Sequence, residues 1–179
     1  MSTAPSQIPH YTLDDYVHWR GDWELWRGAA IAMSPSPFGR HQKVLIALAT
    51  ELRVAIRNRN CHAAVLGELD WIVSNDTVVR PDVMVVCGDG PEGHLRDAPE
   101  LIAEVLSPST RGNDLGFKSN LYAQRGVATY LIVDPETRRI ELRRLDAMGR
   151  YVIIEIGEHL KLNLCDDCEI EISVTEVFN

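Results

Sequence analysis

Two carboxylates stand within otherwise apolar segments of this 179-residue chain. Asp82 lies in the run 78–86, and Glu104 lies in the run 101–106. Both runs are short, rich in β-branched residues and bounded by Pro, Gly or Asp, a pattern typical of buried strands. A charged side chain in such a strand needs a partner, because burying an unpaired charge is strongly unfavourable. These two positions are therefore the first candidates for chemistry.

The segment that joins the two runs, 87–99, is polar and rich in turn formers, which favours a hairpin. A hairpin folded symmetrically about Gly93 puts Asp82 opposite Glu104, since each lies eleven residues from that centre. Directly opposed residues have Cβ atoms roughly 4.5–5.5 Å apart, and like charges at that distance destabilise a sheet. A cation such as Mg²⁺ would offset the repulsion, because it takes oxygen ligands from carboxylates. The alternative is that Asp82 sits at a solvated strand end and that Glu104 pairs with an arginine.

A helix is expected from Asp114 onward, with Asn113 or Asp114 as its N-cap. Lys118 and Tyr122 are four residues apart and share one face of this helix. Lys118 can thus face the carboxylates, where an ammonium group can orient a water molecule and neutralise charge in a transition state. A lone lysine on a helix is usually a solvated charge, and only its position after this hairpin singles out Lys118.

These residues belong to a longer pattern that covers most of the chain, and its most specific part is the run 104–110. The pattern consists of the segments Tyr11 to Tyr16, Met33-Ser34-Pro35, His41, Pro81-Asp82, Glu104 to Thr110, Asp114, Lys118, Tyr122 and Leu131 to Pro135. With it the chain resembles the Uma-type family of putative restriction endonucleases, a bacterial family of the PD-(D/E)XK phosphodiesterase superfamily.

The resemblance implies a restriction-endonuclease-like α/β fold with a mixed central sheet flanked by helices. It implies that Asp82, Glu104 and the main-chain carbonyl of Val105 hold Mg²⁺ or Mn²⁺, and that Lys118 is the catalytic lysine. The implied activity is metal-dependent endonuclease cleavage of phosphodiester bonds in DNA, leaving 5′-phosphate and 3′-hydroxyl ends. Cutting both strands would imply a homodimer.

Two positions depart from the pattern. The superfamily lysine is expected two residues after the glutamate, where this chain has Leu106, so the role has moved to Lys118 or been lost. The acidic turn of family members is Arg27-Gly28-Ala29 here, which puts in doubt any role for that turn in the site. A non-catalytic module that binds nucleic acid or a protein therefore stays open as an alternative, followed by a hydrolase for another phosphoester. The chain has no glycine loop for phosphates and no dinucleotide fingerprint.

Four further residues could assist the site: Tyr122, His41, Glu24 and Glu68. The resemblance places His41 near the site, although taken alone it is a surface histidine in the first turn of a helix, where a charged imidazole is disfavoured. Glu24 alternates with two tryptophans in a short strand, and we favour a solvated carboxylate over one that supports a metal. Glu68 shares a strand face with Asp70 and either extends the acidic pocket or faces solvent.

Helical and strand periodicities alternate along the chain, with extra strands at both ends, and this order matches the α/β core that the resemblance implies, in which helices cover a mixed central sheet. We expect residues 1–10 to form a flexible tail and residues 11–179 to form one nuclease-like domain. The expected helices are 12–17, 39–58 and the segment from 114, and the expected strands are 23–26, 30–33, 63–73, 78–86, 101–106, 126–135, 140–145, 151–156 and 169–172.

The formal net charge of −8 disfavours tight non-specific binding to nucleic acid. It does not exclude a nuclease, because a bound cation reverses the local sign of charge at the site. No apolar stretch approaches the roughly 18 residues of a membrane span, and the first residues lack the features of a secretory signal. We therefore expect a cytoplasmic protein without membrane contact.

The four cysteines are Cys61, Cys87, Cys165 and Cys168. Cys165 and Cys168 have the spacing of half a zinc knuckle, but no second Cys or His pair completes it. We therefore predict a turn between two strands at this position, no stoichiometric zinc and, from the cytosolic character of the chain, no disulfide.

Overall fold

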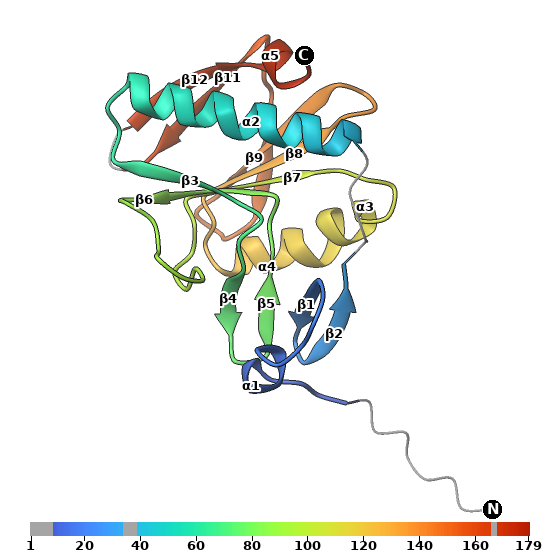
Figure 1. Cartoon of the computed structure of the whole chain (residues 1–179). Coiled ribbons are helices and arrows are strands. Elements are labelled where there is room, and N and C mark those ends of the chain that lie inside the picture. Colours follow the sequence, from blue (N-terminus) through green and yellow to red (C-terminus); the bar gives the residue numbers. More distant parts are fainter. Residues whose placement is uncertain (1–8, 34–38, 166–167) are drawn as a thin grey trace, which may run out of the picture.

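The computed structural model describes residues 9–33, 39–165 and 168–179. The tail expected at 1–10, apart from its last two residues, and the chain break expected at 34–37 lie outside this range. Figure 1 labels most of the elements. In chain order they are α1 (Leu13–Tyr16), β1 (Trp23–Trp26), β2 (Ala29–Ala32), α2 (Gly39–Asn58), β3 (Ala63–Gly67), β4 (Trp71–Ser74), β5 (Thr77–Val79), β6 (Val83–Cys87), β7 (Leu101–Val105), α3 (Arg111–Asn113), the π-helix η1 (Asp114–Lys118), α4 (Ser119–Gln124), β8 (Thr129–Asp134), β9 (Arg139–Leu145), β10 (Tyr151–Ile154), β11 (His159–Leu164), β12 (Cys168–Ser173) and α5 (Val174–Val177).

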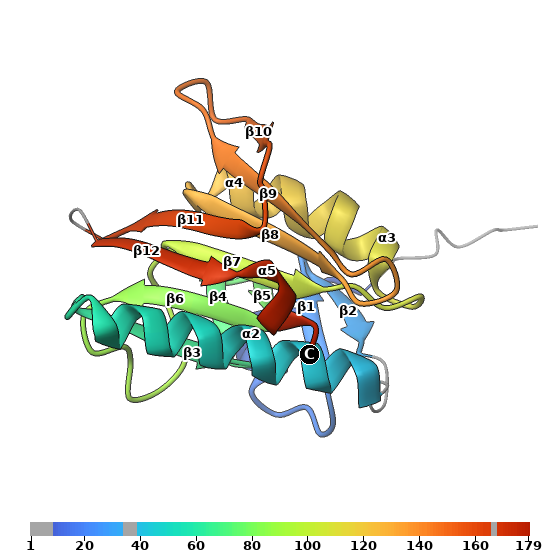
Figure 2. The ribbon, with the colours of Figure 1, turned by 90° about the horizontal axis from the view of Figure 1, so that it is seen from above.

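Six strands form the central sheet in the order β10-β9-β8-β7-β6-β3. β7 and β8 run parallel, whereas the other neighbours are antiparallel, so the sheet is mixed as expected. Both parallel strands are buried along nearly their whole length, because other elements cover both faces of the sheet. The helices α3, η1 and α4 form the crossover that a parallel pair requires. At the far end, the β9–β10 hairpin projects from the rest of the molecule (Figure 2).

One face of the central sheet is covered by α2, α5 and the β11–β12 hairpin, which lie above it in Figure 1. The expected apolar stripe of α2 is confirmed, with Leu48 and Leu52 fully buried against the sheet. This layer is apolar throughout, and its sheet residues include Val83, Val85, Leu101, Ala103, Val105, Leu131 and Val133. Among the described residues, no helix, including the 20-residue α2, is both long and apolar enough to cross a membrane.

The opposite face is covered by α4 and by a second, four-stranded sheet of order β2-β1-β5-β4, which lie below the central sheet in Figure 1. The core here is rich in aromatic rings, including the fully buried Tyr122 and Tyr130. β1 and β2 turn at Arg27 and Gly28, whose φ angles of 48° and 83° suit a two-residue hairpin. The strands expected at 23–26 and 30–33 are therefore confirmed.

Two strands expected as continuous are each divided between the two sheets, and on this point the sequence prediction was wrong. Within the run 63–73, β3 ends at Gly67 and β4 begins at Trp71. Between them Glu68 has a left-handed backbone conformation with a φ angle of 47°. The run 78–86 is broken at 80–82 in the same way. A hydrogen bond from the Glu68 amide to the Asp82 carbonyl (3.1 Å) joins the two breaks. The sequence does mark both crossings, with Gly67, Glu68 and Asp70 in one run and Arg80, Pro81 and Asp82 in the other, but the apolar residues on each side made each run look like one strand.

The prediction that the chain lacks disulfides was also wrong. Cys61 is bonded to Cys168, and Cys87 is bonded to Cys165. The bonded residues are 107 and 78 positions apart, so only the packing of the β11–β12 hairpin against the end of the central sheet brings them together. The predicted turn between β11 and β12 is present, with the Cys168 amide donating to the Cys165 carbonyl, and its two aspartates lie outside the described residues.

Candidate active site

The predicted pairing of the two carboxylates follows from the register of β6 and β7. Val83 pairs with Ala103 and Met84 with Ile102, and this register places Asp82 opposite Glu104. The two ends are tied by hydrogen bonds: the Val105 amide donates to Asp82 Oδ2 (2.7 Å), and the Asp82 amide donates to Glu104 Oε2 (3.3 Å). Both carboxylates thus meet at the point where β7 ends.

Lys118 reaches this point from the helix that follows β7. Its Nζ lies 3.1 Å from Glu104 Oε1 and 3.1 Å from Glu24 Oε1, and 3.8 Å from Asp114 Oδ1. Tyr122, one turn further on, donates from its hydroxyl to the same Glu104 oxygen at 2.5 Å. The shared face of Lys118 and Tyr122, predicted from their spacing, therefore points at Glu104.

The lysine lies at the end of a π-helical turn, η1, between α3 and α4. π-Helical turns are rare and are frequently found at functional sites. The segment 111–124 is thus helical from Arg111, and neither Asn113 nor Asp114 caps it, contrary to the prediction. Asp114 is instead buried, with its carboxylate turned toward Lys118. The i, i+4 spacing of Asp114 and Lys118 was the signal that could have identified this pair.

Burial and charge shift the protonation of this cluster. Burial raises the pKa of Glu104 well above its usual range, and the Lys118 ammonium opposes that shift. Burial likewise raises the pKa of Asp114, to about 6, again against Lys118. Burial would lower the pKa of Lys118, but the surrounding carboxylates, with Glu104 first, outweigh it and raise that pKa. Lys118 therefore stays charged and is the counterion of the buried carboxylates.

Glu24 is buried beside Lys118, so the preference for a solvated carboxylate was wrong. Its side chain is buried in β1, where Oε1 contacts Lys118 and accepts a hydrogen bond from the Arg80 amide at 2.7 Å. The indole of Trp26 donates to Oε2 at 2.8 Å. Alternation along β1 was read correctly, but the face that holds Glu24 packs against the helix and not against solvent.

His41 is buried at the start of α2, near the site as the resemblance implied, and it is not the surface residue that its position alone suggested. Its Nε2 lies 3.3 Å from Asp82 Oδ2, while its Nδ1 has no hydrogen-bond partner among the described residues. Burial lowers the pKa of His41, but the hydrogen bond to Asp82, the charge of Asp82 and a backbone hydrogen bond with Val105 together raise it.

Glu68 and Asp70 do not share a strand face, contrary to the prediction, because the chain crosses between sheets at this point. Glu68 is exposed and lines the mouth of the site. Asp70 is buried elsewhere, where its Oδ1 accepts from Arg80 Nε at 2.7 Å and its Oδ2 accepts from the Tyr16 hydroxyl at 2.9 Å. Asp70 therefore supports the small sheet and not the site.

The site opens into a hollow of about 470 Å³ between β2, the start of α2 and the loop after β7. The hollow is lined by Glu24, Ile31, Ala32, Met33, His41, Glu68, Asp82, Ser107 to Thr110, Asn113, Asp114 and Lys118. Leu106 is absent from this lining and borders a separate groove beside Arg111 and Arg143. The position where the superfamily pattern expects a lysine thus faces away from the hollow.

No group of three or more His, Cys, Asp or Glu side chains within residues 9–33, 39–165 and 168–179 forms a ready metal-binding cluster. Asp82 and Glu104 nonetheless offer facing carboxylate oxygens beside the main chain of Val105. Two carboxylates and one carbonyl form the all-oxygen donor set that suits Mg²⁺ or Mn²⁺, whose other positions are filled by water or phosphate. The residues present therefore fit such an ion.

Residues 13–175 match the sequence model of the Uma2 family, described as "Putative restriction endonuclease". The chain belongs to the Uma2 family. The match covers most of the described chain, including every residue of the site, and the resemblance noted in the sequence is confirmed.

This Uma2 chain is also similar to one protein in sequence and to another in structure. It is 28% identical over 167 residues to an uncharacterized protein of Synechocystis, and the alignment covers 88% of this chain and 86% of the relative. Its structure is similar to the crystal structure of a putative nuclease belonging to DUF820 from Anabaena variabilis, with a TM-score of 0.73 and 18% identity over 93% of this chain and 97% of the other. At that identity the structural likeness shows a shared fold.

Proposed function

We propose that this Uma2 protein is a metal-dependent endonuclease that hydrolyses phosphodiester bonds in DNA. The observation that carries the proposal is the meeting of Asp82 and Glu104 on opposed strand ends with Lys118 at 3.1 Å from Glu104. A buried lysine held among carboxylates at the edge of an open hollow is costly for stability, so its retention favours a role in chemistry. The family match supports a nuclease.

Asp82, Glu104 and the Val105 carbonyl would hold Mg²⁺ or Mn²⁺ at the floor of the hollow. When bound, such an ion activates water for attack and stabilises the charge of the leaving oxygen. Asp82 is fixed for this role by the Val105 amide, and Glu104 by Tyr122, so both carboxylates are preorganised before any ligand enters.

Lys118 would hold the attacking water and neutralise charge on the phosphate. Glu24 and Glu104 lie at 3.1 Å from its ammonium and Asp114 lies at 3.8 Å, and Lys118 also lines the hollow, where its ammonium would meet the water and the phosphate. In the reaction a water oxygen bonds to phosphorus, the bond from phosphorus to the 3′ oxygen breaks, and the 3′ oxygen takes up a proton. The products are a 5′-phosphate and a 3′-hydroxyl.

A nicking assay on supercoiled plasmid DNA tests the proposal. We expect cutting in Mg²⁺ or Mn²⁺, none in EDTA, and loss of cutting in Asp82→Asn and in Glu104→Gln, because each removes one charged ligand. The matched control is Glu92→Gln, which changes an exposed carboxylate on the connection between β6 and β7. Calorimetry should show divalent binding by the parent and the control, and not by the two site variants.

The alternative, a non-catalytic nucleic-acid or protein-binding module, is favoured by two observations: Lys118 already has anionic partners, and Leu106 replaces the usual lysine. The same assay separates the two functions. Unchanged metal affinity in both site variants, together with no cutting in any metal, would contradict the nuclease.

Cutting of both strands of a duplex would further require two sites, which a homodimer could supply. Sedimentation in the presence of DNA measures whether the protein is a monomer or a dimer.

A further inference from the structure

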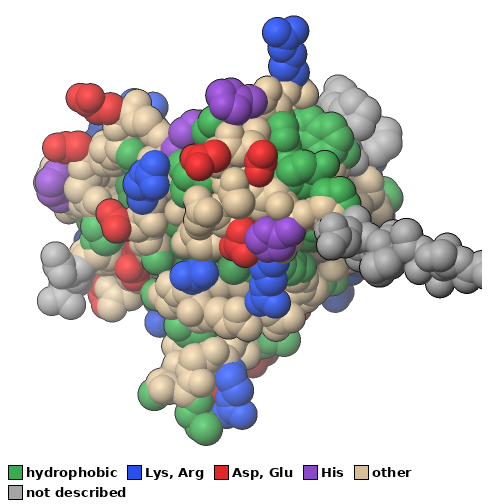
Figure 3. Space-filling view, turned by 90° about the horizontal axis from the view of Figure 1, so that it is seen from below, with side chains coloured by type: hydrophobic (Ala, Val, Ile, Leu, Met, Phe, Trp, Pro, Cys, Tyr) green, Lys and Arg blue, Asp and Glu red, His purple; other side chains and the backbone are tan. Residues whose placement is uncertain are grey.

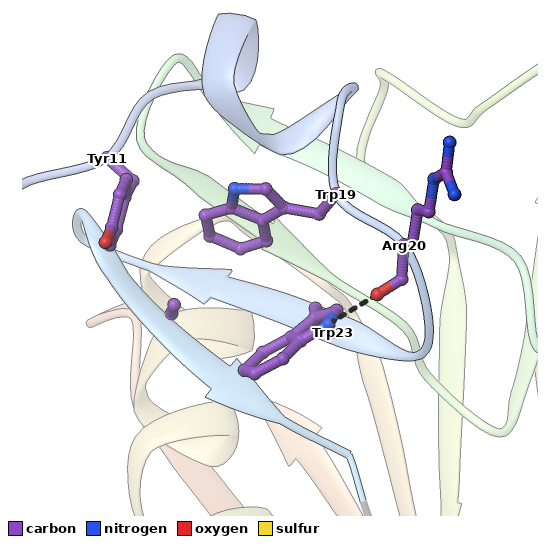
Figure 4. Close-up of a pocket in the computed structure, with 5 residues that line it drawn as sticks. Tyr11, Trp19, Arg20 and Trp23 are labelled. Carbon is purple, nitrogen blue, oxygen red and sulfur yellow. Dashed lines mark hydrogen bonds between the residues drawn. The ribbon is translucent and has the colours of Figure 1, made fainter.

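A second hollow, of about 300 Å³, lies on the outer face of the small sheet. It is lined by Tyr11, Trp19, Arg20, Trp23 and Ala30, and we call it the aromatic pocket (Figure 4). The function proposed above makes no use of these side chains. Tyr11 and Trp19 are partly buried against the neighbouring core, so the pocket is a small hollow lined by three aromatic rings, and such rings can stack on a flat ligand.

The aromatic rings of the pocket are held in place by contacts with one another and with neighbouring residues. The ring of Trp19 packs edge-on against the rings of Tyr11 and Trp23, with ring centroids 5.2 Å and 5.9 Å apart. It also packs against the ring of Tyr16, with centroids 5.4 Å apart. The indole of Trp23 donates to the Arg20 carbonyl at 2.9 Å. In Figure 4, Trp19 lies between Tyr11 and Trp23. The small side chain of Ala30 also lines the pocket. The pocket is thus preformed.

The aromatic pocket and the candidate active site lie on opposite faces of one hairpin. Trp23 precedes Glu24 in β1, and Ala30 precedes Ile31 in β2, so alternation sends the first of each pair to the aromatic pocket and the second to the site. β2 is an edge strand of its sheet. A chain molecule that passes over this edge would therefore contact both hollows at once.

The charge around the aromatic pocket restricts what it can bind. No lining residue in the described part of the chain is acidic, and the exposed Arg20 guanidinium has no ion pair or hydrogen bond with described residues. Aromatic cages for methylated ammonium groups favour a cation, which Arg20 would repel. A flat ring with an attached phosphate suits the pocket, because the ring can stack on the aromatic side chains and the phosphate can pair with Arg20.

We propose that the aromatic pocket binds an unpaired nucleobase of the substrate, with its phosphate on Arg20. This inference rests on the proposed nuclease function and specifies its substrate class: nucleic acid with at least one unpaired nucleotide beside the cleaved bond. Such binding is compatible with the net charge of −8, because base stacking contributes affinity that does not require a basic surface. In Figure 3, which views the face below the small sheet, Lys and Arg are scattered among Asp, Glu and His without a continuous basic area among the described residues.

Binding of a fluorescently labelled short oligothymidylate in EDTA, followed by anisotropy, tests this site without cleavage. Ala30→Leu fills the pocket while keeping every ring, and Arg20→Gln removes the charge. We expect each to weaken binding roughly tenfold or more, the scale of one lost base stack or phosphate contact. Ala29→Leu, an equal change at the adjacent exposed position on the other face of β2, is the control and should stay within about twofold of the parent. A duplex of equal length should bind more weakly than the single strand.

The outcomes separate this inference from the proposed function. Oligothymidylate affinity that is unchanged in both Ala30→Leu and Arg20→Gln would overturn the aromatic pocket as a base site, even if plasmid is cut. Loss of affinity in these variants without any cleavage would support the base site and contradict the nuclease. Displacement of the oligonucleotide by tetramethylammonium, but not by thymidine monophosphate, would assign the pocket to cations and overturn the proposal.

Discussion

β7 separates two interiors of opposite character. On one side Leu101, Ala103 and Val105 pack beneath α2 in a layer that is apolar throughout. On the other side Glu104 is 2% exposed, almost as deeply buried as those neighbours. Its carboxylate accepts hydrogen bonds from Lys118 and Tyr122. Alternate residues of one five-residue strand therefore serve two environments.

The difference shows where stability and chemistry lie in this fold. Burial of apolar surface contributes about 25 cal/mol per Å² and needs no partner. A buried ion cluster gains little net free energy, because desolvation of each charge offsets the attraction between charges. The apolar side is also tied by both disulfides, which anchor the β11–β12 hairpin, whereas α3, η1 and α4 carry no covalent tie to the sheet. The apolar side therefore makes the clearer contribution to stability, and the proposed function offers a reason for the buried ion cluster on the other side.

Reduction of both disulfides should have the largest effect on stability. Each closes a long loop, and such bridges typically contribute roughly 2–4 kcal/mol by restricting the unfolded chain. We expect a marked fall in melting temperature in dithiothreitol, measured by calorimetry, with plasmid cutting unchanged at a temperature where the reduced protein stays folded. Loss of cutting by reduced but folded protein would show that the two sides are not independent. A thiol count of four in native protein would contradict the disulfides themselves.

Leu101→Ala, on the apolar face of β7, should lower the free energy of unfolding by about 2–5 kcal/mol, because it opens a cavity in a closely packed layer. Urea denaturation measures the loss. The specific rate of cutting, corrected for the folded fraction, should match the parent. Val152→Ala is the control, since this side chain on β10 is 46% exposed and its truncation should change stability by only a few tenths of a kcal/mol.

Asp114→Asn should have a smaller effect that depends on pH. The pKa of Asp114 in the folded chain is about 6, above its usual 3.8, so the charged form lowers stability above pH 6 and this loss disappears as the group is protonated at lower pH. One pKa unit corresponds to about 1.4 kcal/mol, so the variant should gain up to about 3 kcal/mol near pH 8 and little near pH 4. Melts at both pH values check this. An equal gain at both would show that Asp114 does not carry the cost.

Sequence patterns predicted the parts of the site that depend on local spacing. The opposition of Asp82 and Glu104 follows from the symmetry of one hairpin, and the common target of Lys118 and Tyr122 follows from one helical turn. Both relations involve few residues that are close along the chain or joined by a single turn. The mixed sheet was implied by the family resemblance, with which the order of strand and helix patterns agreed.

What sequence reasoning missed depends on contacts between distant elements. Glu24 is buried because β1 packs beneath a helix nearly a hundred residues later, and no pattern within β1 records that contact. The cysteine pairing depends on where the β11–β12 hairpin lies on the sheet. The breaks at Gly67 and Arg80 occur where buried strands pass from one sheet to the other. Gly67 and Pro81 mark these positions, but the sequence alone does not show that the strands on either side join different sheets.

The central claim is that the ionic side of β7 is catalytic and that Lys118 supplies the ammonium group absent at Leu106. The direct test compares plasmid cutting by Lys118→Ala with that by the parent in Mn²⁺. A thermal melt confirms folding, and Lys161→Ala, at an exposed lysine of β11, is the control. The account predicts that Lys118→Ala cuts roughly 10²–10⁴-fold more slowly, the scale of general acid–base and electrostatic contributions, while divalent binding survives. If folded Lys118→Ala cuts as fast as the parent, Lys118 is only the counterion of a buried cluster and the account is contradicted.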